Sequence, residues 1–444
     1  MSESKPSSRT LDRDVAGGIA ASVASRRPVV AVVGGGISGL AVAHYVRRTG
    51  AECIVLEAAH RTGGVIASLH EEGRILELGP QRTRLTPPLL ALVESLGLTD
   101  RLVTAPDLPL YIYSRGRLRS VPLDLCGALT TDLISWTDRL RMLCEPFTRG
   151  LDPNESAADF FIRKFGRRVY REALAPLFGD LYGSDPAEMP AGHALAALLR
   201  SLRIEGSLLR ALFRAFRSGK RFCACSFDGG LQVLTDAMAS RLGGRVRTLS
   251  TVQAIHRDGS RYRIVLDVDE ISADRVVLAC PAGPAARMLA TLDSGTSERL
   301  GTLRYNRFAV VHLIAENPFH GSGYQVTLGS GFATCGVTCN AALFDRAGLY
   351  TAFLGGAGRR NVPELPDADL GALASTEFGE ITGGASRPLA VHRTYMPAWD
   401  TSWNGLADVH LPQGMNICAN WLGRPGITAR LAEAEKMAEQ VAAA

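Results

Sequence analysis

The sequence predicts an α/β fold, in which a parallel-sheet domain built from separate chain segments accompanies a substrate domain with a mixed or antiparallel sheet and a helical subdomain. Three observations predict it. An apolar run at residues 28–33 leads through a glycine-rich turn into a helix-length apolar stretch, which is the order of a βαβ unit. Residues 308–315 and 350–354 have the composition of antiparallel strands. A final apolar strand at 415–420 precedes a helix that begins near Gly426.

The composition limits the class of protein. The chain has 444 residues, of which 46% are apolar and 21% charged, so a disordered or collagen-like chain is excluded. A net charge of +5 is too small to indicate nucleic-acid binding. Nine cysteines give neither a disulfide framework nor a paired zinc pattern, so we expect a reducing, cytoplasmic location and no metal site. No apolar run reaches membrane-spanning length.

The first βαβ unit carries a G-x-G-x-x-G pattern between strand and helix. Gly34 permits the tight turn, Gly36 lets the backbone approach a pyrophosphate, and Gly39 allows the helix to pack closely on the strand. The helix N-terminus supplies positive dipole charge, and Glu57 lies about 20 residues further on, where an acid accepts ribose hydroxyls. The pattern predicts a Rossmann-like dinucleotide site. Its residues are Gly34, Gly36, Ile37, Ser38, Gly39 and Glu57.

A second glycine pair follows at once. Ala58, Arg61, Gly63 and Gly64 complete an E-x3-R-x-G-G pattern with Glu57. The glycines let the backbone approach the cofactor again, and the arginine is available to its phosphates; the alternative is a surface turn. On these residues the chain resembles the FAD-binding amine oxidase superfamily, and the resemblance implies FAD as cofactor.

Further segments resemble the protoporphyrinogen and coproporphyrinogen oxidase branch of that superfamily. They are the E-L-G-P segment at residues 77–80, E-S-x-x-x-F at 155–160, residues 176–186, and residues 273–279. The resemblance implies that Gly79 and Pro80 pass near the flavin and that Val252 meets the adenine through its backbone. For Val252, a plain edge strand is the competing interpretation.

The C-terminal segment has its own physical interpretation. A helix N-terminus near Gly426, Ile427 and Thr428 would point at the flavin pyrimidine, where its dipole stabilises the negative charge of the reduced cofactor. The alternative is a helix that only closes the domain. The family usually reads G-V-G-x-x-D/N-C-I here, and this chain departs from that signature after Ile427.

The resemblance also implies a division of the chain. It gives three parts of an FAD-binding domain at 28–84, 227–302 and 404–444, a helical, substrate-binding and membrane-contacting domain at 85–226, and a substrate-domain sheet at 303–403. The composition of residues 1–27, which are rich in Ser, Ala and Arg and lack an apolar core of signal-peptide length, predicts a flexible tail.

The implied activity is FAD-dependent oxidation of a porphyrinogen, protoporphyrinogen IX or coproporphyrinogen III, to the porphyrin of heme biosynthesis. Dioxygen would accept the electrons and give hydrogen peroxide. Porphyrinogen oxidases often carry a basic residue where this chain has Pro109 and Leu110. Arg82 and Arg84 are therefore the candidates for binding substrate carboxylates, with plain exposed arginines as the alternative. No catalytic acid or base is assigned, because the cofactor carries the difficult step.

Two rival functions stay open. One is a desaturase or oxidase of another apolar or natural-product substrate, which the change at Pro109 and Leu110 favours. The other is a non-catalytic FAD-binding or membrane-adaptor protein, which the altered residues after Ile427 favour.

A basic segment lies at residues 199–222. It carries seven basic residues and one acid, and Arg210, Arg214, Arg217 and Arg221 fall on one helical face. This pattern is typical of a helix on the inner face of an anionic membrane. The alternative is a solvated face over a core-packed stripe.

Overall fold

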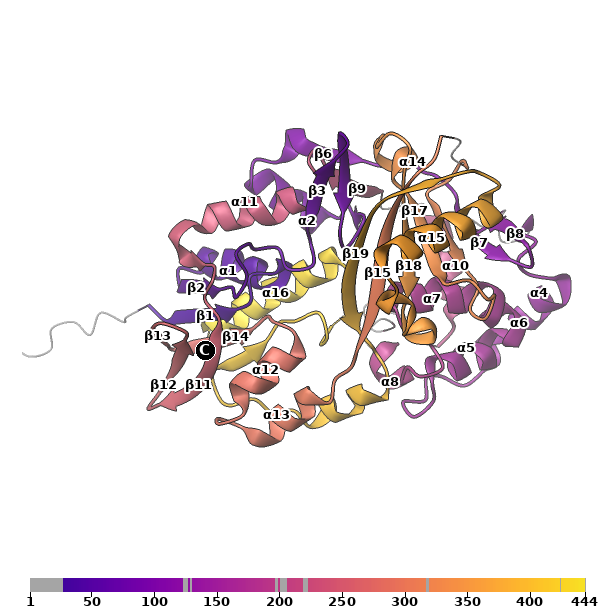
Figure 1. The fold of residues 1–444 in the computed structure, drawn as a ribbon. Helices are drawn as coiled ribbons and strands as arrows, with labels where there is room; N and C mark the ends of the chain where they lie inside the picture. The colour runs from indigo at the N-terminus through magenta and orange to yellow at the C-terminus, as the bar shows by residue number, and fades with distance from the viewer. Residues whose placement is uncertain are drawn as a thin grey trace, which may run out of the picture.

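The computed structural model describes residues 27–122, 127, 130–195, 199, 206–218, 223–316, 319–423 and 425–443. The tail expected at residues 1–27 therefore lies outside the described residues except for Arg27. Figure 1 shows a parallel sheet with its helices at one end of the molecule, a large twisted sheet in the middle, and a group of helices at the other end.

The parallel sheet is assembled from strands that are far apart in the sequence. Its order is β10-β2-β1-β14-β20, and every neighbouring pair is parallel. The strands are Val246–Arg247, Glu52–Leu56, Val29–Val33, Arg275–Leu278 and Met415–Ile417. β1 is central and buried, which explains its unbroken apolar run. Helices α1 (Ile37–Arg48) and α16 (Ile427–Ala443) pack against each other over this sheet, and the predicted α/β class is confirmed.

The large sheet has seven strands in the order β19-β15-β18-β17-β16-β7-β8. The strands are Arg387–Pro397, Tyr305–Ile314, Leu349–Gly355, Thr334–Cys339, Gly323–Val326, Leu110–Ser114 and Arg117–Ser120. Only the β16–β7 pair is parallel, so the sheet is mixed, as the fold class predicts. Alternate residues of β15, such as Val311 and Leu313, pack with Phe378 of helix α15 (Asp367–Thr382), which covers one face.

The helical region lies beyond the large sheet. It contains α4 (Trp136–Met142), α5 (Ala157–Phe165), α6 (Arg167–Val169), the π-helical turn η3 (Tyr170–Leu174), α7 (Ala175–Tyr182), α8 (Ala191–Ala194) and α10 (Leu208–Ser218). Helix α7 contacts β16 and β17, so it lies over the large sheet. Among the described residues, no helix combines the length and apolar character needed to cross a bilayer.

The remaining elements are short. Strands β3 (Ser68–Glu71) and β4 (Arg74–Glu77) form a hairpin, and β11 (Val252–Asp258), β12 (Arg261–Leu266) and β13 (Glu270–Ala273) an antiparallel sheet. A third small sheet contains β5 (Thr83–Arg84), β9 (Ala224–Phe227) and β6 (Leu102–Thr104). Further α-helices in the described part of the chain are α2 (Pro87–Ser95), α11 (Gln232–Leu242), α12 (Ala282–Leu289), α13 (Ser294–Gly301) and α14 (Asn340–Phe344). The 3-10 turns are η1 (Thr99–Arg101), η2 (Glu145–Phe147), η4 (Gly243–Arg245), η5 (Ala357–Arg359), η6 (Val362–Glu364) and η7 (Thr401–Asp408).

The basic segment predicted at 199–222 is not one continuous helix. Gly206 and Ser207 are non-helical, and α10 begins only at Leu208. Arg210 and Arg214 are exposed on α10, in agreement with their shared face. The basic residues Arg200, Arg203, Lys220 and Arg221 lie outside the described residues.

A buried carboxylate fixes the start of α10. Glu145 accepts hydrogen bonds from the Leu208 and Leu209 amides at 2.9 and 3.2 Å and from the Ser207 hydroxyl. Its ion pair with Lys164, 2.9 Å long, has side chains only 0% and 1% exposed. Burial alone would raise the pKa of Glu145, but these hydrogen bonds and the Lys164 ammonium hold it below its ordinary value. The carboxylate therefore stays charged and caps the helix.

Replacing Lys164 by Met should leave the Glu145 carboxylate buried without its cation. We expect the variant to lose about 3–5 kcal/mol of unfolding free energy, measured by chemical denaturation at neutral pH. The pKa of Glu145 is depressed in the folded state. The difference in unfolding free energy between wild type and variant is therefore present above the ordinary pKa of a glutamate, and it disappears as the pH falls through the folded-state pKa of Glu145. As a control, Arg307→Met breaks the surface pair with Glu364 and should cost under about 1 kcal/mol. Equal losses of unfolding free energy in Lys164→Met and Arg307→Met would contradict a special role for the buried Glu145–Lys164 pair.

Candidate functional site

Segments that are distant in the sequence meet at one edge of the parallel sheet. Because all five strands are parallel, their carboxyl ends lie together. Gly34 follows β1, Glu57 follows β2, Ala279 follows β14 and Cys418 follows β20. Helices α1 and α16 both begin at this edge, so two positive helix ends face the same space.

The first glycine turn leaves no room for a side chain at Gly34 or Gly39. A Cβ on Gly39 would lie 1.9 Å from the Gly34 carbonyl oxygen, and Gly34 itself has a φ of +111°. Gly36 precedes α1 in an extended conformation, and no side chain caps the first amides of the helix. On the open side of Gly36, the nearest atom to a Cβ placed there would be the Cα of Gly64, at 3.9 Å. The uncapped amides and the open space form a cradle for an anionic group.

The second glycine turn lies directly against the first. The Gly63 amide donates to the Gly35 carbonyl at 2.8 Å, and Gly36 and Gly63 form a parallel bridge. Arg61 braces this turn, because its guanidinium donates to the carbonyls of Thr62, Ile66 and Gly64 at 2.9, 3.2 and 2.9 Å. The structure thus brings Arg61, Gly63 and Gly64 to the cradle, with the arginine shaping the turn.

Glu57 holds the loops on both sides of itself. Its Oε2 accepts from the Gly35 amide at 2.6 Å and its Oε1 from the Ala59 amide at 2.8 Å, with Ala58 between. The Ser250 amide donates to the Glu57 carbonyl at 2.9 Å, which brings Val252, buried at the start of β11, to the same edge. These contacts bring Glu57 and Val252 to the same edge, and their roles toward a ribose and an adenine stay predictions.

The Gly79-Pro80 turn is clamped by a side chain that the sequence analysis missed. A Cβ on Gly79 would lie 2.1 Å from the Val65 carbonyl oxygen, so this turn also requires glycine. The amide nitrogen of Gln81 donates to the carbonyls of Glu77 and Gly79 at 2.9 and 3.0 Å. Its oxygen accepts from Asn340 at 2.9 Å, which ties the turn to the large-sheet region.

A buried polar network continues from this clamp. Asn340 also donates to Thr351 at 2.9 Å, and the Thr351 hydroxyl lies 3.1 Å from Nδ1 of His312. Burial, aided by the nearby His392 and Arg346, lowers the pKa of His312 to about 4, so its imidazole is neutral near pH 7. The network carries no acid–base pair of the kind used in proton transfer, and we assign it a positioning role.

The C-terminal segment closes the edge. Gly426 has a φ of +100° and α16 starts at the next residue, which places Ile427 and Thr428 in its first turn. The Trp421 indole donates to the Cys280 carbonyl at 3.0 Å. Arg430, which is 4% exposed, donates to the Ala419 carbonyl at 2.8 Å. Neither contact is predictable from the local sequence, because each joins residues whose proximity depends on the tertiary fold.

Arg82 and Arg84 differ in their surroundings. Arg84 is exposed on β5. Arg82 is largely enclosed and donates to the Ser322 carbonyl at 3.3 Å, and the Ser322 amide in turn donates to the Pro109 carbonyl at 2.8 Å. Among the described residues, no carboxylate lies within ion-pair distance of Arg82. Burial, and then the like charge of Arg84, lowers the pKa of Arg82, as expected for a cation without a counter-charge.

Comparisons with known proteins agree with this geometry. The family model for flavin containing amine oxidoreductases matches residues 37–413. The chain is 25% identical over 406 residues to a chloroplastic protoporphyrinogen oxidase of Nicotiana tabacum, covering 81% of this chain and 73% of the relative. It is 27% identical over 424 residues to the protoporphyrinogen oxidase of Bos taurus, covering 83% of this chain and 88% of the relative. It is 25% identical over 382 residues to the coproporphyrinogen III oxidase of Bacillus subtilis strain 168, covering 77% of this chain and 80% of the relative.

Solved structures share the fold. A candidate protoporphyrinogen oxidase from Exiguobacterium sp. 255-15 superposes with a TM-score of 0.75 at 21% identity, covering 94% of this chain and 99% of that one. Cyclohexylamine oxidase from Brevibacterium oxydans IH-35A gives a TM-score of 0.67 at 16% identity, with 94% and 99% covered.

Changing Glu57 to Gln removes a charged acceptor from the cradle. We expect FAD to bind about 10- to 100-fold more weakly, because a hydrogen bond to a charged group is worth about 1.5–3 kcal/mol. Titration of the apoprotein with FAD, followed by flavin fluorescence, measures the change. Glu52→Gln, an exposed acid at the start of the same strand, is the control and should bind FAD normally. An unchanged FAD affinity in Glu57→Gln would show that the carboxylate has no part in the site.

Proposed function

The chain belongs to the flavin-containing amine oxidoreductase family and is an FAD-dependent oxidoreductase, and we propose that it oxidises a porphyrinogen to the porphyrin. Protoporphyrinogen and coproporphyrinogen oxidases are among its relatives at about 25% identity across most of their length. We also propose dioxygen as the electron acceptor, so that each two-electron step forms one hydrogen peroxide from one dioxygen and the two hydrogens removed from the substrate.

The proposal depends on one observation, the enclosure of the Arg82 guanidinium without a paired carboxylate among the described residues. A largely enclosed guanidinium is costly unless an anion neutralises it, and the described residues offer Arg82 only the carbonyl of Ser322. Ser322 also donates its amide to the Pro109 carbonyl. Pro109 and Leu110 stand where porphyrinogen oxidases often carry a basic residue. We infer that Arg82 supplies from another segment the charge that Leu110 lacks, and that it receives a substrate carboxylate.

The remaining chemistry needs little from the protein. When bound, FAD supplies the two-electron oxidation. The cradle residues hold it through the two glycine turns, Glu57 and the N-terminus of α1. The clamp made by Gln81 and Asn340 fixes the Gly79-Pro80 turn against the large sheet, so that cofactor and substrate can be held in one geometry.

Mixing the anaerobic enzyme with coproporphyrinogen III or protoporphyrinogen IX tests the proposal. We expect the flavin absorbance near 450 nm to bleach with at least one of them and to return when air is admitted. A flavin that is reduced by dithionite but by neither porphyrinogen would contradict a porphyrinogen substrate and would favour a rival apolar substrate.

The Arg82→Gln variant of the same enzyme should show kcat/KM lowered by about 10- to 100-fold with the active porphyrinogen, since a charged hydrogen bond to substrate is lost. The control Arg299→Gln, an exposed residue of α13, should stay within about twofold. A loss in Arg84→Gln with none in Arg82→Gln would assign the carboxylate to the other arginine.

An exposed apolar patch supports peripheral contact with a membrane. Trp136 and Leu140 share one face of α4, Leu143 follows at its C-cap, and the three side chains are 72%, 66% and 63% exposed. Phe147 follows at 87% exposure in the segment that contacts α10. Figure 1 places α4 at the end of the molecule remote from the parallel sheet. This patch lies within the membrane-contacting domain predicted at 85–226, but outside the basic segment at 199–222.

Basic side chains are exposed on α4 and on other elements of the helical region. Arg141, Arg149, Arg167, Arg210 and Arg214 are all exposed. Apolar side chains flanked by cations are the composition of a surface that binds an anionic bilayer without crossing it. We therefore propose that α4 and α10 together rest on the membrane surface.

Replacing Trp136 and Leu140 by Ser should lower the bound fraction at least about tenfold in sedimentation with vesicles of phosphatidylcholine and phosphatidylserine, because each buried side chain contributes about 1.5–3 kcal/mol. Val268→Ser, an 89% exposed apolar residue on another part of the chain, is the matched control. Wild-type protein that fails to sediment with these vesicles at low salt would contradict the contact.

A further inference from the structure

A cavity of about 560 Å³ lies where helix α7 and strand β18 end and strand β17 begins. None of its lining residues belongs to the cradle, and its volume is that of a small-molecule site. Part of its wall is made of glycine backbone, at residues 179, 183, 329, 331, 355, 356 and 358. Cβ atoms on Gly183 and Gly356 would lie 2.8 and 2.9 Å from the ring of Phe308, so the cavity backs directly onto β15 of the large sheet.

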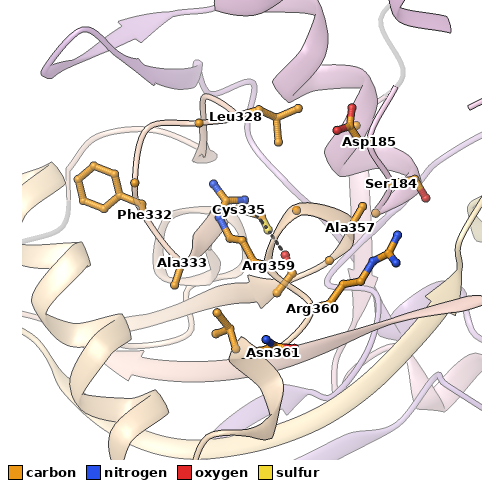
Figure 2. Close-up of a pocket in the computed structure, with 18 residues that line it drawn as sticks. Ser184, Asp185, Leu328, Phe332, Ala333, Cys335, Ala357, Arg359, Arg360 and Asn361 are labelled. Carbon is orange, nitrogen blue, oxygen red and sulfur yellow. Dashed lines mark hydrogen bonds between the residues drawn. The ribbon is translucent and has the colours of Figure 1, made fainter. Parts of the chain in front are cut away.

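The cavity contains a guanidinium without a counter-ion. Figure 2 shows Arg359 beside Cys335 within the cavity. Its Nη1 donates to the Cys335 sulfur at 3.5 Å, a weak acceptor that leaves its other N–H groups available. In the described part of the chain no carboxylate pairs with Arg359, although the side chain is half-buried.

The other charged groups at the cavity are already engaged. Arg360 is exposed and pairs with Glu188 at 3.1 Å. Asp185 is the acidic lining residue, and its Oδ1 accepts from the Ala187 amide at 2.9 Å. Arg359 is thus the cation that the cavity can offer to an anionic ligand.

The cavity and Arg82 lie beyond opposite ends of one strand. Arg82 binds Ser322, the residue before β16, and the cavity is lined by Leu328 and the residues that follow β16. The four extended residues of β16 alone span about 13 Å. Two arginines separated in this way could hold carboxylates at opposite edges of one tetrapyrrole.

We infer that this cavity is a second carboxylate-binding site, in which Arg359 receives the carboxylates of the substrate edge opposite to the edge held by Arg82. The inference rests on the proposed porphyrinogen oxidation. It predicts discrimination between substrates. Coproporphyrinogen III carries propionates on all four rings and can engage both arginines, whereas protoporphyrinogen IX carries two, on adjacent rings, and can engage only one.

The test compares Arg359→Gln with wild type on both porphyrinogens. We expect kcat/KM for coproporphyrinogen III to fall about tenfold or more and that for protoporphyrinogen IX to change less than twofold. Arg359→Lys should recover part of the loss, since it restores the charge without the fork. Arg360→Gln is the matched control and should behave as wild type on both. Equal effects on the two substrates, or none, would overturn the inference.

Binding of the product separates this inference from the proposed function. Oxidised holoenzyme is titrated with coproporphyrin III and followed by porphyrin fluorescence, which requires no turnover. If the wild-type enzyme turns over neither porphyrinogen, the proposed activity is contradicted. Coproporphyrin III binding that is about tenfold weaker in Arg359→Gln than in wild type would still support the second carboxylate-binding site. Equal binding by the two proteins, or no binding by wild type, would overturn it.

Discussion

The close approach of backbone to backbone at the carboxyl edge of the parallel sheet is the constraint on which the rest of the structure depends. A side chain on Gly39 would collide with the Gly34 carbonyl, and one on Gly79 with the Val65 carbonyl. Only glycine lets α1, the second glycine turn and the E-L-G-P turn converge within a few ångströms. The space they leave is lined by amides and helix N-termini, which suits the flavin dinucleotide of the family.

The second domain has to be held in a fixed position relative to that edge, and buried polar contacts provide the link. Arg346 pairs with Glu77 at 2.9 Å, with side chains 5% and 1% exposed, and Glu77 also accepts from the Leu231 amide. Gln81 and Asn340 make a parallel connection a few residues away. Such contacts are costly to break once one partner is removed, so they specify one arrangement of the sheets. That arrangement also encloses Arg82 next to Ser322.

Local patterns in the sequence predict local structure well and distant contacts poorly. The strands at residues 28–33, 308–315 and 350–354 are recovered within a few residues, because each is an apolar run whose burial decides its conformation. The helix predicted over 199–222 is wrong in extent, because its start is set by Glu145, more than 60 residues away. The roles of Gln81 and Arg430 carry no local signal at all, since their partners are chosen by the tertiary fold. A patch such as the face of α4 can be seen in the sequence as a spacing, but its exposure cannot.

The central claim is that an enclosed guanidinium at Arg82 receives the carboxylate of a tetrapyrrole beside the flavin. A crystal structure of the FAD-loaded enzyme with bound coproporphyrin III measures this most directly. The account predicts a propionate oxygen within about 3.2 Å of the Arg82 guanidinium, with the macrocycle over the large sheet. A tetrapyrrole bound elsewhere, or one whose propionates all lie in solvent while Arg82 keeps Ser322 as its sole partner, would contradict it.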